Sequence, residues 1–92
     1  MEVLLDGRLM TGREAVHDIL TEKLNLPAYY GRNLDALYDV LSCNPEEVKI
    51  TLIFPDVMRD SLGRYADALV KTLADAAAQN PKVDFLISFE NN

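Results

Sequence analysis

Residues 26–39 read LPAYYGRNLDALYD, and this stretch predicts a surface loop followed by a helix that the rest of the chain must hold in place. A proline and a glycine enclose two tyrosines in a short loop, and Asn33 then offers a side-chain oxygen that can cap a helix. Apolar side chains recur at helical spacing after it and are expected to face a core: Leu34, Leu37, Val40 and Leu41. The opposite side of that helix then carries Asp35, Tyr38, Asp39 and Ser42. An aromatic loop and an acidic helix face are therefore predicted to adjoin each other at the surface.

The acidic charge of this helix is concentrated rather than balanced. Asp35 and Asp39 are i,i+4 neighbours, and such a like-charge pair costs an isolated helix roughly 0.2–0.5 kcal/mol. No Lys or Arg lies between positions 33 and 48, whereas Glu46 and Glu47 add negative charge there. Asp35 has a structural explanation, because a carboxylate in the first turn complements the helix dipole. Asp39 lies beyond the first turn without a basic residue four positions away, so it is predicted to bind a cationic partner; the alternative is an ordinary solvated charge.

Length and composition limit the class of protein. Ninety-two residues are expected to form one domain, spanning 1–92, with a small core. The chain has 15 acidic and 9 basic side chains and a net charge of −6, which disfavours direct binding of nucleic acid. Cys43 is the only cysteine, so no internal disulfide can form and a cytoplasmic location is expected. The first residues lack the features of a signal peptide and no apolar run reaches the length of a membrane span, so no membrane partner is expected.

Hydrophobic periodicity and turn residues predict alternating strands and helices. Strands are expected at residues 2–5, 48–54 and 83–87, and the strand at 48–54 is expected to carry Val48, Ile50, Leu52 and Phe54 on one side. Helices are expected from a capping box at Thr11 and Glu14 to about Asn25, from Asn33 to Asn44, and over residues 65–79, with only a brief helical turn at 56–60. Strands that alternate with helices favour an α/β fold with a small three-stranded parallel sheet.

The single residues of the loop and its surroundings have separate expected roles. One of Tyr29 and Tyr30 is expected to pack on the first helix, and Tyr29 is the expected contact to a partner, because tyrosine combines a large contact area with little rotamer entropy. Gly31 is expected to supply a positive φ angle before the helix. His17 is placed on a polar flank of the first helix, and neither it nor Cys43 has the companions of a catalytic nucleophile. Two carboxylates at i,i+4 lack the ligand number of a metal cage, so no metal site is predicted.

The order of residues from Pro27 to Asp39, Pro-x-Tyr-Tyr-Gly-x-Asn-Leu-Asp-Ala-Leu-x-Asp, resembles the barstar family of intracellular protein inhibitors of secreted bacterial ribonucleases. The resemblance implies a three-stranded parallel sheet flanked by helices and no cofactor. It also implies that the loop and the acidic helix enter the active-site cleft of a basic bacterial ribonuclease, of the barnase-like or another guanyl-specific type, where carboxylates replace substrate phosphates. Carried over residue by residue, the partner-binding positions are Tyr29, Tyr30, Gly31, Asn33, Leu34, Asp35, Tyr38 and Asp39, with Asp75 of the long helix as a further acidic contact.

Two positions depart from the family pattern. Tyr38 stands where the family often has tryptophan, which makes the aromatic contact there smaller. Arg32 places a positive charge between the loop and the acidic helix, where it opposes the steering of a basic ribonuclease or instead meets an acidic rim on a different partner. The leading prediction is a ribonuclease inhibitor and not an enzyme. The alternative is a barstar-like interaction or regulatory module without a ribonuclease partner.

Overall fold

The computed structural model describes residues 1–89, and the strands in this range form one parallel sheet. β1 (Glu2–Asp6), β2 (Val48–Ile53) and β3 (Val83–Ser88) lie in the order β1-β2-β3, so β2 is central. The predicted α/β fold with a three-stranded parallel sheet is confirmed. The predicted domain extended to residue 92, and residues 90–92 lie outside the described residues.

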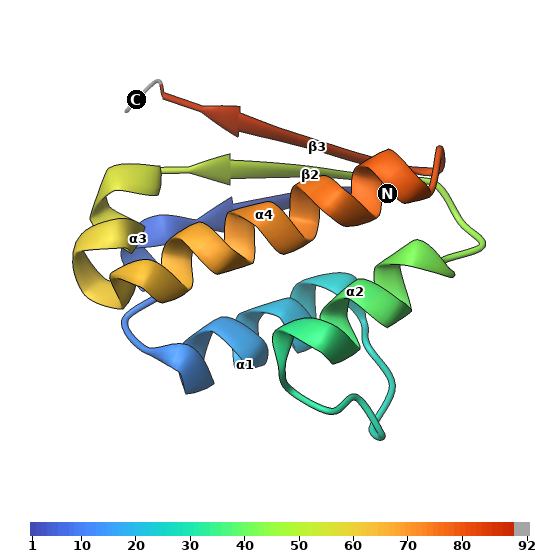
Figure 1. Cartoon of the computed structure of the whole chain (residues 1–92), viewed down its shortest axis with the longest axis horizontal. Coiled ribbons are helices and arrows are strands. Elements are labelled where there is room, and N and C mark those ends of the chain that lie inside the picture. Colours follow the sequence, from blue (N-terminus) through green and yellow to red (C-terminus); the bar gives the residue numbers. More distant parts are fainter. Residues whose placement is uncertain (90–92) are drawn as a thin grey trace.

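Helices pack against one face of this sheet. The helices are α1 (Arg13–Leu24), α2 (Leu34–Ser42), α3 (Pro55–Leu62) and α4 (Arg64–Gln79). Figure 1 shows α1 and α2 below the strands, α4 crossing in front of β1, and α3 at one end of the sheet. Alternate strand residues such as Val3, Ile50 and Leu52 are buried, whereas Leu4 on the other face is exposed. This period of two is typical of a sheet with one covered face. No helix within residues 1–89 is long and apolar enough to cross a membrane.

α2 is capped by its own N-cap residue and is attached to the rest of the fold along its inner side and at its C-terminal end. It packs against α4, with Leu37 and Leu41 buried. At its start, the Asn33 side chain accepts a hydrogen bond from the N–H of Ala36 at 2.7 Å, which confirms the predicted cap. At its end, the buried Asn80 amide donates to the carbonyl of Leu41 at 3.0 Å. The outer side of α2 is therefore presented on a rigid support.

Three local predictions were wrong, and each for a backbone reason. Gly12, not Thr11, is the N-cap of α1, so the expected capping box falls out of register and no side chain caps this helix. Phe54 does not continue β2, because it adopts a left-handed conformation at φ 54° and turns the chain into α3. Pro55 then begins an eight-residue helix where only a brief turn was expected, since proline is favoured in a first helical turn.

Candidate protein-binding surface

Asp35 and Asp39 form the most distinctive surface feature, which we call the acidic face. Both side chains are exposed on α2, four residues apart. In the part of the chain that the structure describes, neither makes an ion pair, whereas other aspartates do: Asp6 with Arg8, Asp18 with Arg32, Asp67 with Arg59, and Asp75 with Lys71. The acidic face therefore keeps its two negative charges available to a cationic ligand.

The two tyrosines of the loop point in different directions. Tyr29 is 86% exposed, and Tyr30 is only 7% exposed. The expectation that one of them packs on the first helix is confirmed for Tyr30, whose hydroxyl bonds to His17 of α1. Tyr29 offers almost its whole ring to a partner, whereas Tyr30 has little surface left for contact and its clearest contribution is to position the loop.

His17 is buried and bonds to two tyrosines, an arrangement that we call the His17 hub. The prediction that it lies on a polar flank of α1 was therefore wrong. The Nδ1 atom of His17 lies 2.7 Å from the Tyr30 hydroxyl and its Nε2 lies 2.7 Å from the Tyr65 hydroxyl, so it joins α1, the loop and α4. Burial is the main reason that the pKa of His17 is lowered, and the positive charge of Arg32 adds to it. Burial also raises the pKa of Tyr30 to about 12. The histidine is therefore neutral, and one ring nitrogen donates while the other accepts.

The sequence contained a signal for this hub that the prediction missed. His17 lies next to Val16 and three residues before Leu20, and both of those side chains are fully buried. A residue at that spacing is on the inner side of an amphipathic helix. The partners Tyr30 and Tyr65 are 13 and 48 residues away along the chain, so the spacing alone could not identify them.

The backbone before α2 also differs from expectation. The left-handed residue is Arg32, at φ 54°, and not Gly31, which has no positive φ. Gly31 instead lies close to α2, since a Cβ atom there would be 3.2 Å from the Cβ of Ala36, which is tighter than most such contacts. The Arg32 guanidinium reaches back to α1, where it donates to the Asp18 carboxylate at 2.7 Å and to the carbonyl of Glu14 at 3.3 Å.

The remaining predicted site residues lie at different depths. Leu34 is half-buried and packs against the core, and Asn33 is exposed while its side chain serves as the helix cap. Tyr38 is half-buried against the core rather than fully outward. Asp75 lies exposed on α4 and is engaged by Lys71 at 2.8 Å. The acidic face and Tyr29 are thus the parts of the predicted site with the most surface to offer.

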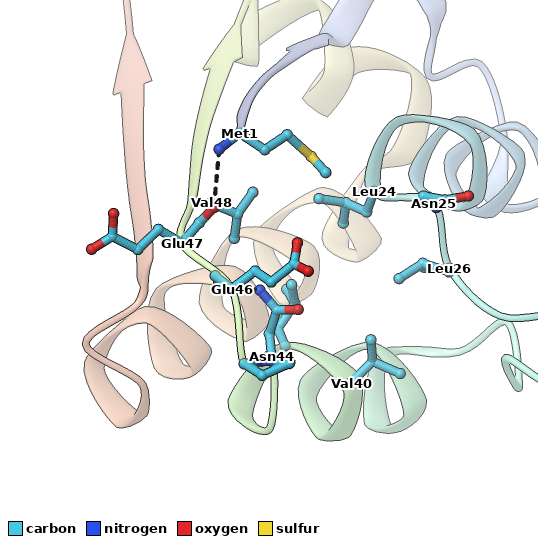
Figure 2. Close-up of a pocket in the computed structure, with 11 residues that line it drawn as sticks. Met1, Leu24, Asn25, Leu26, Val40, Asn44, Glu46, Glu47 and Val48 are labelled. Carbon is cyan, nitrogen blue, oxygen red and sulfur yellow. Dashed lines mark hydrogen bonds between the residues drawn. The ribbon is translucent and has the colours of Figure 1, made fainter.

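Two hollows adjoin α2. One of about 330 Å³ is lined by Arg13, His17, Arg32, Asn33, Leu34, Asp35 and Tyr65. The other, of about 240 Å³, lies near the C-terminal end of α2 and is drawn in Figure 2, where the Met1 ammonium donates to the carbonyl of Glu47 at 3.0 Å. Among residues 1–89 no group of three His, Cys, Asp or Glu side chains could hold a metal ion.

An exposed tyrosine is a residue type enriched at surfaces that bind other proteins, and here it accompanies two exposed carboxylates without a basic partner in residues 1–89. Comparison with known proteins agrees. Residues 1–90 match the family described as Barstar (barnase inhibitor), and the chain therefore belongs to the barstar family. It is also similar to a protein of Bacillus subtilis (strain 168) named "Putative ribonuclease inhibitor YrdF", with 36% identity over 91 residues that cover 97% of this chain and 98% of the relative. Inhibitors of this family are binding proteins without enzymatic activity, so this chain is not an enzyme.

Proposed function

We propose that this protein inhibits a basic bacterial ribonuclease by covering its active-site cleft with the Tyr29 loop and the acidic face. The observation that carries the proposal is the exposure of Asp35 and Asp39 without a basic partner in the described residues. The family description as a barnase inhibitor and the name of the Bacillus subtilis relative support the choice of a ribonuclease as the target. A barnase-like or other guanyl-specific enzyme is the partner that this family suggests.

The mechanism is electrostatic substitution combined with steric blocking. A ribonuclease binds substrate phosphates with cationic side chains. Two carboxylates one helical turn apart can bind the same cationic side chains in place of the phosphates. The net charge of −6 attracts a basic enzyme over a distance and speeds the encounter. The ring of Tyr29 then supplies contact area next to the charged centre. Inside the cytoplasm of a cell that makes the enzyme, such a complex protects the cell's own RNA.

A titration of ribonuclease activity tests this function. Purified protein is added to several small basic bacterial ribonucleases, and we expect activity to disappear near a one-to-one ratio for at least one of them. The double variant Asp35→Asn/Asp39→Asn is the matched control, since it removes both charges without changing the size of the side chains. Wild-type association should slow as salt rises, because exposed charges are screened over about 10 Å at 0.1 M ionic strength. Full activity in the presence of a large excess of wild-type protein would reject the proposal.

A second candidate function is a barstar-like interaction module whose partner is not a ribonuclease. The fixed position of the Arg32 guanidinium beside the acidic face favours it, because this cation opposes the approach of a basic protein. Affinity purification from native lysate and from culture medium distinguishes the two candidates. Recovery of a basic ribonuclease supports the inhibitor, and recovery of a protein without nuclease activity supports the module.

A further inference from the structure

Two arginines converge on the hollow that borders the acidic face. Arg13 lies at the start of α1, and its guanidinium carbon lies 4.4 Å from the centre of the Tyr65 ring. That ring is itself held by the hydrogen bond between its hydroxyl and Nε2 of His17. Stacking uses the flat face of a guanidinium and leaves its N–H groups at the edge able to donate. Within residues 1–89 the Arg13 side chain makes no ion pair or hydrogen bond, so these donors are available to a ligand.

Arg32 is held at the same hollow at a cost to the fold. A residue with a side chain in the left-handed conformation is strained by about 1–3 kcal/mol, a cost that glycine would avoid. Its ion pair with Asp18 is exposed on both sides, and such pairs contribute roughly 0–1 kcal/mol. The pair therefore does not offset the strain. The arginine at this position is better explained by a contact outside the chain than by stability.

We propose that the hollow between Arg13 and Arg32 receives an acidic side chain, Asp or Glu, from the rim of the ribonuclease cleft. This inference rests on the proposed function and deepens it. A basic enzyme that meets Asp35 must bring its cations next to Arg32, and this repulsion disappears if a carboxylate of the enzyme lies opposite the two arginines. Its carboxylate accepts from the free edge of Arg13 and from the Nε and Nη1 groups of Arg32, because the bonds of Arg32 to Asp18 and to the carbonyl of Glu14 both use Nη2.

The consequence is specificity. A face with carboxylates on one side and arginines on the other is complementary only to an enzyme with the opposite pattern. An enzyme that is basic throughout is attracted by the acidic face and repelled by the arginines. Arg13 and Arg32 would thus select among ribonucleases that the acidic face alone cannot tell apart.

The test compares two double variants with the same loss of charge. Arg13→Gln/Arg32→Gln removes the proposed site, and glutamine keeps the backbone strain at position 32. Arg8→Gln/Arg59→Gln is the control, because Arg8 also lies over an aromatic ring at 4.0 Å and Arg59 also pairs with an aspartate, and neither lines the hollow. Urea unfolding first establishes that both variants fold, and the single variants replace either double variant that does not.

Dissociation rates from the ribonuclease that the wild-type protein inhibits then decide. We expect Arg13→Gln/Arg32→Gln to dissociate at least tenfold faster, and the control to dissociate at the wild-type rate. Changing the carboxylates at the rim of the enzyme to amides, one at a time, should identify one whose loss weakens the wild-type complex but not that of Arg13→Gln/Arg32→Gln.

Three results would overturn the inference. Dissociation of Arg13→Gln/Arg32→Gln at the wild-type rate means that the arginines make no contact with the enzyme, and slower dissociation means that they repel it. Saturable binding of inorganic phosphate to the free wild-type protein, lost in that variant, means that the hollow is a site for a small anion. Failure of the wild-type protein to inhibit any ribonuclease rejects the proposed function as well, whereas the first two results leave that function standing.

Discussion

Both α2 and α4 carry exposed aspartates, but of these, within residues 1–89, only the aspartates of α4 form ion pairs. On α4, Asp67 accepts two hydrogen bonds from Arg59, at 3.0 and 3.1 Å, and Asp75 accepts one from Lys71 at 2.8 Å. On α2, Asp35 and Asp39 have no such partner in residues 1–89. Both helices bury apolar side chains on their inner faces. The difference between them is therefore confined to how the outer charges are compensated.

This difference separates charges that serve the fold from charges that serve a partner. An exposed i,i+4 pair of opposite sign stabilises a helix by roughly 0.2–0.5 kcal/mol, and a pair of like sign destabilises it by a similar amount. On α4 the pair of Lys71 and Asp75 has this favourable spacing, and Asp67 pairs with Arg59 of α3, whereas Asp35 and Asp39 repel each other on α2. The repulsion is small beside the burial of Leu37 and Leu41 and the Asn33 cap, so the fold tolerates it. Substitutions on the two helices should therefore affect different measurable quantities.

The largest expected effect is that of Asp39→Ala on binding. We expect affinity for the inhibited ribonuclease to fall by at least about 2 kcal/mol, the size of a central interface contact. The free energy of unfolding should stay the same or rise slightly, because repulsion with Asp35 is relieved and alanine is the better helix former. Calorimetric titration measures the first quantity and urea unfolding the second.

Asp67→Ala on α4 is the matched control, and it should show the reverse pattern. It breaks the ion pair with Arg59 and should lower stability by less than about 1 kcal/mol without changing affinity. A clear loss of stability in Asp39→Ala together with unchanged affinity would remove Asp39 from the binding surface and with it the contrast between the helices.

A second prediction concerns the two tyrosines of the loop. Tyr30→Phe removes the hydroxyl that bonds to His17 Nδ1 and leaves a buried polar atom without its partner, which should lower the free energy of unfolding by about 1–2 kcal/mol. Tyr29→Phe changes an exposed ring and should alter stability by less than about 0.5 kcal/mol. Equal effects in urea unfolding would mean that the His17 hub does not hold the loop.

The fold was largely predictable because its signals are local. The alternation in β2, the Asn33 cap and the stripe of Leu34, Leu37 and Leu41 each lie within a few residues of sequence, and the structure confirms the elements that they indicated. Gly31 shows the limit of such signals. Glycine is compatible with a positive φ, but the path of the chain places that angle one residue later and brings Gly31 close to α2.

The surface was less predictable because it depends on contacts between distant segments. The outward direction of the acidic face follows from helical spacing, and it was predicted. The Arg32 contact to Asp18, the His17 bonds and the bond from Asn80 to Leu41 join residues from different elements, so no periodicity reveals them. The partial burial of Tyr38 likewise depends on what packs beside α2.

A third prediction follows from the lowered pKa of His17. The folded state holds this histidine neutral below its ordinary pKa of 6.5, so the unfolded state binds more protons in that range. The contribution of His17 to the free energy of unfolding should therefore be fully present above pH 6.5. It should fall as the pH decreases through 6.5 towards the lower pKa of the folded state. Arg32 opposes protonation and Asp18 favours it, so burial sets the direction. Urea unfolding at several pH values measures the decline, and a His17→Gln variant should show a flatter profile below pH 6.5. The same slope in both proteins would assign the decline to other groups.

The smallest expected effect is that of Lys71→Gln. This change tests whether Asp75 belongs to the binding surface although it forms an ion pair with Lys71. Lys71 holds Asp75 in an exposed i,i+4 pair, so Lys71→Gln should lower stability by only roughly 0.2–0.5 kcal/mol. If Asp75 contacts the ribonuclease, the same change frees its carboxylate from a competing cation, and affinity should rise slightly while stability falls. Asp75→Asn should then weaken binding, and the two changes together should not be additive. The matched pair is Arg59→Gln and Asp67→Asn. These changes break the ion pair between α3 and α4 and should leave the dissociation rate unchanged. If Lys71→Gln and Arg59→Gln alter binding equally, the gain reflects net charge alone, Asp75 serves only the fold, and the surface is confined to α2 and its loop.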